Sequence, residues 1–266
     1  MTKLRLDALL AERGLYESRS RAAASVLAGE VYIGPGRRRA EKPGQLVADD
    51  VALDVDAPPP FVSRGGVKLA NALQATGLDV SGRHALDVGA STGGFTDCLL
   101  SGGAAAVVAV DVGYGELHWR LRNDPRVTVL ERTNARGLTA EQLPFRPDLA
   151  VVDVSFIGLA KVLPAVLACL EERFDCLAMV KPQFEVGRER VGRGGVVRDP
   201  AHRRAALLEV AGGAARLGAG VMGMQPSGLP GPKGNLETFL WLAEAGRPGA
   251  TRDGDELQHL AEAVAA

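Results

Sequence analysis

The sequence predicts an α/β protein in which a doubly wound, mostly parallel sheet follows a small N-terminal α+β domain. Two observations predict the sheet: short apolar runs alternate with helical segments from residue 61 onward, and several of these runs end at a charged residue. A proline-rich segment at 57–60 separates the small domain, because three prolines cannot continue a helix or a central strand. We therefore expect a domain at 1–56, a linker at 57–62, a second domain at 63–245 and a C-terminal tail at 246–266.

The composition is that of an ordinary soluble protein. The chain has 266 residues, and 46% of them are hydrophobic, which is enough for a packed core. Its longest apolar runs, at 104–110 and 162–170, are much shorter than the roughly 18 to 20 residues that span a bilayer. Charges interrupt the first residues, unlike the apolar segment of a signal peptide. We expect a cytoplasmic protein with no membrane partner.

The cysteines and histidines give no sign of a disulfide or a metal site. Cys98, Cys169 and Cys176 lie in apolar segments without C-x-x-C spacing, so we interpret them as buried reduced thiols. The four histidines are scattered along the chain without the spacing of metal ligands. We expect no bound metal.

The first 45 residues are more cationic than the rest of the chain. The formal net charge of the whole chain is -1, yet this segment holds nine Lys or Arg residues against five acids. Leu4 to Leu10 predict a short amphipathic helix, a second helix is expected from Ser18, and residues 31–33 and 47–55 supply strands. A small cationic domain of this kind suits a phosphate-rich partner, although its arginines could also serve only to solvate a surface.

The large domain opens with a pattern typical of a nucleotide crevice. An apolar run at 85–88 is followed by Gly89 and by a glycine pair at 93–94, where missing side chains let the backbone approach a ligand. A second apolar run, 104–110, ends at Asp111, where the ribose of a nucleotide would need a hydrogen-bond acceptor.

Three interpretations of this glycine loop are open. A dinucleotide site of the G-x-G-x-x-G type would need a glycine at position 91, where the chain has a serine. Asp87, two residues before Gly89, is instead typical of enzymes that use S-adenosylmethionine (SAM). The loop could also be only a tight turn into the helix expected at 95–100. A SAM site is the leading hypothesis.

Further strands of the sheet are expected at 127–130, 149–154 and 176–180, at the spacing of β-α-β units. In such a sheet the carboxyl ends of the parallel strands lie along one edge, and ligands bind there. Four charged residues then share this edge: Asp87, Asp111, Asp153 and Lys181.

A tetrad of charged residues stands at positions that the expected sheet brings together. Asp153 and Lys181 each follow a buried strand, Lys68 lies on the helix before the first strand, and Glu237 lies inside an apolar strand. Each has an ordinary explanation by itself, such as a solvent-facing lysine, a helix cap or a surface ion pair. Together they indicate a catalytic crevice.

The segments around these four residues resemble the RNA ribose 2'-O-methyltransferases of the FtsJ/RrmJ type, which carry a Lys-Asp-Lys-Glu tetrad in this order. The N-terminal segment RLDALLAERGLYESRSRAAASVLAGEVYIGPGRRRAEKPG is similar to the S4 RNA-binding fold. The combination resembles the TlyA family of bacterial rRNA methyltransferases, also labelled hemolysins. The resemblance runs through SRGGVKL, LDVGASTGGFTDCLL, VVDVSFI, MVKPQFE and GNLETFLW. It implies a Rossmann-like SAM methyltransferase domain at 63–245 and an S4-like RNA-binding domain at 1–56.

The resemblance implies catalytic roles for Lys68, Asp153, Lys181 and Glu237. Lys181 would contact the ribose 2'-oxygen, either as a cation that stabilises the developing alkoxide or as a base that accepts its proton. Asp153 and Glu237 would hold Lys181 in place. Lys68 would balance their charge and orient the ribose.

The resemblance also implies SAM as the cofactor. Asp111 would accept hydrogen bonds from the ribose hydroxyls of SAM, and Asn134 would read its adenine. The implied cofactor-binding residues are Asp87, Gly89, Ser91, Thr92, Gly93, Gly94, Phe95, Asp111, Val112 and Asn134.

The implied partner is rRNA within ribosomal subunits. Cytidines of the 30S subunit are the first candidate targets and those of the 50S subunit the second; the family is linked to susceptibility to capreomycin-type antibiotics. A glycine-rich segment at 186–199 carries four arginines and is expected to form a mobile loop over the RNA, unless it is a surface loop without function. No protein partner is predicted. The implied RNA-binding residues are Arg5, Arg19, Arg21 and Arg64.

Two other classes of function are possible for such a chain. A non-catalytic RNA-binding or assembly factor could retain the fold without SAM binding, but the intact tetrad argues against it. A membrane-lytic protein, which the hemolysin label suggests, would need membrane-active segments, and the sequence has no strongly amphipathic basic helix.

Overall fold

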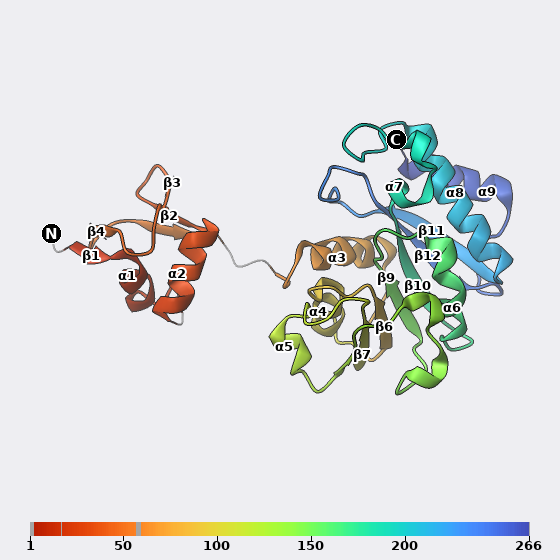
Figure 1. The fold of residues 1–266 in the computed structure, drawn as a ribbon, viewed down its shortest axis with the longest axis horizontal. Helices are drawn as coiled ribbons and strands as arrows, with labels where there is room; N and C mark the ends of the chain where they lie inside the picture. The colour runs from red at the N-terminus through yellow and green to blue at the C-terminus, as the bar shows by residue number, and fades with distance from the viewer. Residues whose placement is uncertain (1–2, 17, 57–59, 266) are drawn as a thin grey trace. The chain divides into compact units, whose positions relative to one another are not determined.

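The computed structural model describes residues 3–16, 18–56 and 60–265, and it divides into two compact units, Met1–Pro58 and Pro59–Ala266. Figure 1 shows the ribbon of both units. Residues 57–59 of the predicted linker lie outside the described residues. Each unit has its own apolar core.

Unit 1 combines two helices with two small sheets. Ser18 caps the second helix, because its hydroxyl oxygen accepts a hydrogen bond from the backbone N–H of Arg21 at 3.3 Å. Leu4, which was expected in the first helix, lies in a strand and pairs with Val47. The elements are β1 (Lys3–Arg5), α1 (Leu6–Glu12), α2 (Arg19–Ala28), β2 (Val31–Ile33), β3 (Arg38–Arg39), β4 (Leu46–Ala48) and β5 (Leu53–Val55). Strand β1 pairs with β4, and β2 lies between β3 and β5.

Unit 2 is built on a seven-stranded sheet in the order β11-β12-β10-β9-β6-β7-β8. Five strands run parallel, and β12 runs antiparallel to both of its neighbours. The predicted mostly parallel sheet is confirmed, and the five parallel strands lie within about two residues of their expected bounds. The strands are β6 (His84–Val88), β7 (Ala106–Val110), β8 (Val127–Leu130), β9 (Leu149–Val152), β10 (Asp175–Val180), β11 (Ala219–Pro226) and β12 (Thr238–Glu244).

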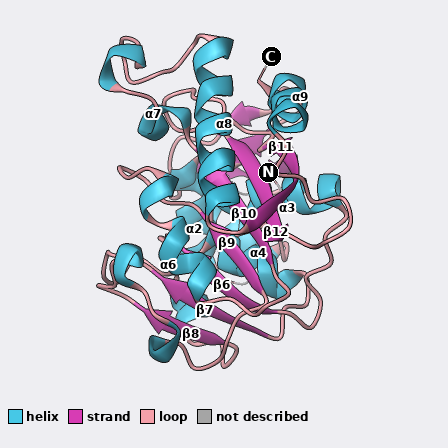
Figure 2. Cartoon of the chain, turned by 90° about the vertical axis from the view of Figure 1, so that its right-hand side faces the viewer, coloured by secondary structure: helices cyan, strands magenta, loops and turns pink. Residues whose placement is uncertain are grey.

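Helices lie on both faces of this sheet (Figure 2). Strand residues alternate between two cores: Leu86 and Val88 belong to one, whereas Ala85 belongs to the other. Helices α3 (Arg64–Thr76) and α4 (Gly94–Ser101) cover the Ala85 face, and α6 (Leu163–Ala168), α8 (Pro200–Arg216) and α9 (Gly254–Val264) cover the other. Two short helices, α5 (Trp119–Arg122) and α7 (Pro182–Glu185), follow strand ends.

The segment predicted as a C-terminal tail contains α9, which packs against α8 and β11. Asp253 starts this helix, since its side chain accepts hydrogen bonds from the backbone N–H groups of Asp255 and Glu256. Leu257 and Ala261 are buried in the core of unit 2. The polar residues before Gly254 therefore lead into an amphipathic helix that belongs to the fold.

Several charged residues lie at the ends of the strands, on one edge of the sheet. The parallel strands β6, β7, β9 and β10 end directly before Gly89, Asp111, Asp153 and Lys181, so these four residues leave the sheet at one edge. Because β12 runs the other way, its first residue reaches this edge, and Thr238 pairs with Val180. Glu237, expected inside a strand, in fact directly precedes β12.

Candidate active site

Two cavities meet at this edge of the sheet, within unit 2. The larger, about 760 Å³, is lined by all four tetrad residues and by Arg64, Gly89, Ser91, Thr92, Gly94 and Phe95. The smaller, about 440 Å³, is lined by Asp111, Val112 and Asn134 and shares Gly89, Ser91 and Asp153 with the larger. The structure thus brings most of the predicted site residues around one connected space.

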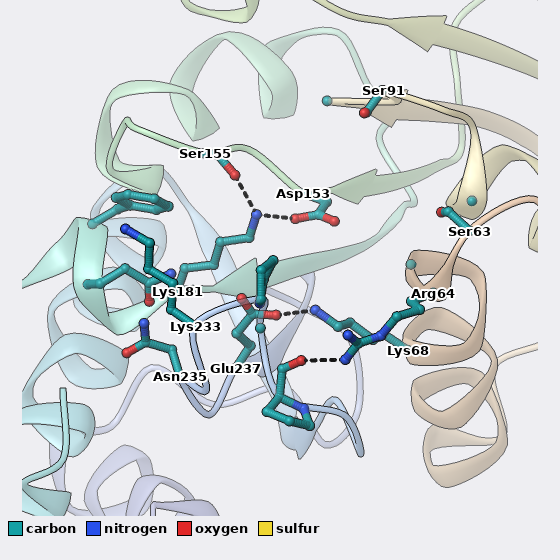
Figure 3. A pocket seen from close by; sticks show the side chains of 18 of the residues that line it. Ser63, Arg64, Lys68, Ser91, Asp153, Ser155, Lys181, Lys233, Asn235 and Glu237 are labelled. Atoms are coloured by element: carbon teal, nitrogen blue, oxygen red, sulfur yellow. Dashed lines mark hydrogen bonds and ion pairs between the residues drawn. The ribbon is translucent and has the colours of Figure 1, made fainter. Parts of the chain in front are cut away.

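Lys181 points from the end of β10 toward Asp153 and Ser155 (Figure 3). Its Nζ lies 2.5 Å from Asp153 Oδ1 and donates a hydrogen bond to Ser155 Oγ at 2.8 Å. Both partners come from the chain that leaves β9, the neighbouring parallel strand. The register of two adjacent strands therefore sets the position of this ammonium group.

The other two tetrad residues form a buried ion pair with each other. The Lys68 ammonium, from α3, donates to Glu237 Oε2, and their side chains are 9% and 2% exposed. Glu237 was expected to hold Lys181, but in the structure its ionic partner is Lys68. The antiparallel direction of β12 brings Glu237, in the connection before the strand, to this edge of the sheet, where Lys68 of α3 forms the ion pair with it. The tetrad is thus two ion pairs that line the same cavity.

The glycine loop follows β6 and requires glycine at its first position. Gly89 has a φ of +86°, and a Cβ there would lie 2.5 Å from the backbone oxygen of Asp153. Any side chain at this position would collide with the main chain that carries Asp153. The absence of a Cβ therefore lets the loop lie beside the main chain that carries Asp153.

Asp111 holds the glycine loop in place from the end of β7. Its Oδ2 accepts a hydrogen bond from the backbone N–H of Ser91, and its Oδ1 accepts from that of Gly113, each at 2.7 Å. A carboxylate has about four acceptor positions, so two remain for a ligand in the smaller cavity. The next side chain, Val112, is 75% exposed at the wall of that cavity.

Asp87 and Gly93, two of the predicted cofactor residues, line neither cavity. The Asp87 side chain is fully buried on the α4 face of the sheet, where its Oδ2 accepts a hydrogen bond from Thr96 Oγ1 at 2.6 Å. Its Oδ1 has no partner among the described residues. Burial raises the pKa of this carboxyl from its usual 3.8 to about 7.

The raised pKa of Asp87 predicts a pH-dependent loss of stability. Below pH 4 the carboxyl is protonated in both states, and between pH 4 and 7 only the folded state retains the proton, so the free energy of unfolding falls as the pH rises through this range. Asp87→Asn removes this titration. We expect the variant to gain up to about 4 kcal/mol relative to wild type between pH 4 and 8, because each pKa unit corresponds to about 1.4 kcal/mol.

Urea unfolding of both proteins at pH 4, 6 and 8 measures this difference. Asparagine retains an oxygen that can accept from Thr96, so the hydrogen bond is preserved. A difference that stays constant over this pH range would contradict the assignment to Asp87.

The predicted RNA-binding arginines fall into two groups. In unit 1, Arg5 and Arg19 lie 2.7 and 3.5 Å from the carboxylate of Asp7, and Arg21 is exposed on α2. In unit 2, the Arg64 guanidinium lines the larger cavity and donates to the backbone oxygen of Pro230 at 2.9 Å. Asp7 therefore orients two of the arginines of unit 1.

Sequence reasoning missed Ser155 and Phe156, which line both cavities. The Phe156 side chain is 91% exposed, its φ is +65°, and its ring centroid lies 5.4 Å from that of Phe184. A non-glycine residue with this backbone conformation is uncommon and often belongs to a functional site. The sequence offered one signal for Phe156, which is its position shortly after the strand that leads to Asp153. An aromatic residue in such an apolar context is usually part of a core, so the signal is weak.

The remaining sequence predictions concern thiols, metals and membranes. Cys98, Cys169 and Cys176 are free and buried, as predicted, and burial raises the pKa of Cys98 and Cys176 to about 12. The described part of the chain contains no group of three or more His, Cys, Asp or Glu side chains arranged to hold a metal ion. No helix of that part has the length and apolar character needed to cross a membrane.

Comparison with known proteins places the chain in a family. The family model of the FtsJ-like methyltransferases matches residues 61–244. A 16S/23S rRNA (cytidine-2'-O)-methyltransferase TlyA from Mycobacterium tuberculosis is 54% identical over 90% of this chain and 90% of its own length. The chain belongs to the TlyA family of FtsJ-like methyltransferases.

Two further relatives show the range of this TlyA family. A 23S rRNA (cytidine-2'-O)-methyltransferase TlyA from Campylobacter jejuni is 34% identical over 74% of this chain and 76% of its own length. A solved structure from Streptococcus thermophilus that carries the hemolysin name is 37% identical, covers 99% of this chain and 96% of its own, and has a TM-score of 0.74. The resemblance that the sequence motifs indicated is confirmed.

Proposed function

We propose that this protein is a SAM-dependent ribose 2'-O-methyltransferase that modifies cytidines of rRNA within ribosomal subunits. The observation that carries the proposal is the meeting of the two ion pairs with the glycine loop in one cavity. The Mycobacterium relative, which matches more of this chain, is named for 16S and 23S rRNA, and the Campylobacter relative for 23S rRNA alone. Both the 30S and the 50S subunit are therefore proposed as substrates.

The residues around the smaller cavity fit SAM. The Gly89 position has no room for a side chain, and the Asp111 carboxylate is fixed by two backbone amides with acceptor positions left over. Gly89, Ser91, Asp111, Val112 and Asn134 would hold the cofactor. When bound, SAM would supply a methyl group made electrophilic by its sulfonium centre.

Lys181 is proposed to act on the ribose 2'-hydroxyl. Its ammonium has three N–H groups; one donates to Ser155 and the group forms an ion pair with Asp153, so at least one N–H is available for the 2'-oxygen. As a cation the side chain stabilises negative charge that develops on this oxygen, and as a neutral amine it accepts the hydroxyl proton. Holding the hydroxyl in line can contribute on the order of 7 to 11 kcal/mol.

The Lys68–Glu237 pair is proposed to form a charge-balanced wall of the cavity. Because both side chains are almost completely buried, the pair adds polar groups for the ribose without adding net charge beside Lys181. Phe156 presents an aromatic face to solvent at the same rim, where a nucleobase could stack.

Unit 1 is proposed to be an S4-like RNA-binding domain at 1–56. Arg5, Arg19 and Arg21 would contact phosphates, with the first two oriented by Asp7. Arg64, in unit 2, would contact a phosphate at the cavity of the methyltransferase domain. Phosphate contacts fix the position of RNA, and the chemistry then depends on the ribose that enters the cavity.

Transfer of labelled methyl from SAM to separated 30S and 50S subunits that lack the modification tests this proposal. We expect label on a cytidine 2'-oxygen, identified by mass after nuclease digestion. Binding of SAM without any transfer to either subunit would contradict the proposed activity, and label on a base atom would contradict the assigned acceptor.

Replacement of Asp111 by alanine tests the cofactor assignment. The variant loses the acceptor proposed for the SAM ribose and also two hydrogen bonds that shape the loop. We expect the dissociation constant for SAM to rise about 10- to 150-fold, the range that corresponds to about 1.5 to 3 kcal/mol for hydrogen bonds to a charged group. Isothermal titration calorimetry measures it.

Asp79→Ala is the matched control for Asp111→Ala. The Asp79 side chain is exposed and likewise accepts a hydrogen bond from a backbone N–H, that of Ser81 at 2.8 Å, but it lines neither cavity. The Asp79→Ala variant should bind SAM with the affinity of the wild-type protein. Equal affinity in the Asp111 variant would remove this residue from the cofactor site.

A further inference from the structure

Two further loops line the larger cavity. The arginine-rich segment 186–199 contributes Val191 and Gly195, and the loop 229–234 contributes residues 230–233, which include Lys233. These loops are about 35 residues apart in sequence, and one side chain, directly after the second loop, forms two hydrogen bonds with the first.

That side chain is Asn235, which is 2% exposed. Its Oδ1 accepts a hydrogen bond from the backbone N–H of Val197 at 2.9 Å, and its Nδ2 donates to the backbone oxygen of Gly195 at 2.8 Å. The oxygen and the nitrogen of this amide therefore both form hydrogen bonds with the arginine-rich segment. The glycine-rich segment was predicted to be a mobile loop, but two hydrogen bonds tie its 195–197 portion to the residue two positions before Glu237.

The cations around the cavity differ in their partners. Lys68 and Lys181 are each paired with a carboxylate, as described above. Among the residues that the structure describes, no carboxylate oxygen lies within 4.0 Å of the charged groups of Arg64 or Lys233. The wall that carries these two residues is thus positively charged without compensation.

Lys233 and Arg64 are held on this wall from different elements. The Arg64 guanidinium, from α3, donates to Pro230 in the same loop as Lys233. The Lys233 ammonium lies 3.6 Å from the place where a side chain on Gly195 would begin, so it reaches across to the segment that Asn235 holds. Figure 3 shows Arg64, Lys233, Asn235 and Glu237 around the cavity.

We propose that Lys233, together with Arg64, binds a phosphodiester that flanks the reacting ribose, and that Asn235 is the positioning residue that holds this wall. The inference rests on the proposed function, since a 2'-hydroxyl in RNA always lies between two phosphodiesters. Each of these carries a full negative charge and attracts an uncompensated cation. The Lys68 and Lys181 ammonium groups are already neutralised and are less suited to this task.

The variant Lys233→Ala tests the contact. We expect the KM for the ribosomal subunit to rise about tenfold with kcat retained, and the slope of log affinity against log salt to fall by about one. Lys233→Arg should restore most of the affinity because it retains the charge. Arg216→Ala, at the far end of α8, removes one exposed cation outside the cavity and should leave the KM unchanged.

The affinity for SAM decides which anion Lys233 binds. An unchanged dissociation constant for SAM in Lys233→Ala supports the phosphodiester, whereas a weakened one would assign Lys233 to the cofactor's own carboxylate and overturn the inference. An unchanged KM would also overturn it. The wild-type protein is measured in the same assay. If the wild-type protein transfers no methyl group, the result contradicts the proposed function and not the role of Lys233.

Limited trypsin digestion tests the role of Asn235 without depending on activity. In Asn235→Ala both hydrogen bonds to the segment are lost, and we expect cleavage after Arg193 and Arg198 to become about tenfold faster than in wild type. Asn71→Ala, which loses an amide hydrogen bond to Ser227, is the control and should not speed this cleavage.

A second variant keeps the test valid if Asn235→Ala fails to fold. Asn235→Ser adds no charge to this buried position, and its hydroxyl can replace at most one of the two hydrogen bonds, so it should give an intermediate cleavage rate. Both variants should raise the KM for the subunit while kcat and SAM affinity remain near wild type. Wild-type cleavage rates in both variants, or a loss of kcat without a change in KM, would overturn the positioning role.

Discussion

Replacement of Lys181 by alanine is expected to reduce methyl transfer by about 10³-fold or more while SAM binding stays close to wild type. The Lys181 Nζ is held by Asp153 and Ser155, which follow the neighbouring strand. It is the group proposed to contact the 2'-oxygen. Loss of a general base or of one charge-stabilising donor each typically costs 10²- to 10⁴-fold in rate. Single-turnover transfer to ribosomal subunits measures the effect.

Two companion variants make the Lys181 result interpretable. Lys161→Ala removes an exposed lysine that lines neither cavity and should transfer methyl at the wild-type rate. Lys181→Arg keeps the positive charge but cannot accept a proton, so its residual rate separates charge stabilisation from proton transfer. Retention of more than a tenth of the wild-type rate in Lys181→Ala would contradict the catalytic role.

Removal of one partner of the Lys68–Glu237 pair is expected to lower the free energy of unfolding by about 3 to 5 kcal/mol. The side chains are 9% and 2% exposed, so Lys68→Ala leaves the Glu237 carboxylate buried without its cation, and Glu237→Ala leaves the ammonium in the same position. The magnitude arises mainly from the unpaired charge, because desolvation of an ion is far more costly than loss of a neutral contact. Urea unfolding at pH 7 measures it.

The double variant Lys68→Met/Glu237→Leu distinguishes an unpaired charge from a packing defect. It replaces both ions by apolar groups of similar size, and we expect it to recover most of the stability while methyl transfer stays impaired. Arg126→Ala, which breaks a partly exposed pair with Asp124, should change the stability by less than about 1 kcal/mol. Additive losses in the double variant would contradict the ion-pair explanation.

Much of the fold and of the site could be predicted from the sequence because the relevant signals are local. The runs that end before Gly89, Asp111, Asp153 and Lys181 are continuous in sequence, and parallel strands place such ends at one edge of a sheet. The requirement for glycine at position 89 was likewise visible as a residue type. The N-cap at Ser18 follows from the same kind of short-range rule.

Other features were hidden because they depend on partners far apart in the chain. Asp87 carries the sequence pattern of a cofactor residue, yet whether its side chain faces a cavity or a core depends on the side of the strand on which it lies. A short helix was possible at the C-terminal end of the predicted tail, but that it belongs to the core of unit 2 follows only from its packing against α8 and β11. Phe156 is exposed, although its sequence context is that of a core residue.

The sequence by itself determined which elements form and which charged residues stand at their ends, because hydrophobic periodicity, glycine positions and strand length are short-range properties. Only the tertiary structure decided how those residues are paired. Glu237, directly before the antiparallel strand β12, pairs with Lys68, whereas Asp153 and Ser155 contact Lys181. The amide of Asn235 joins two segments distant in sequence. Ion pairs and hydrogen bonds act over a few ångströms in space, so the partners of each residue depend on strand order and register. The order of residues along the chain does not specify either of these.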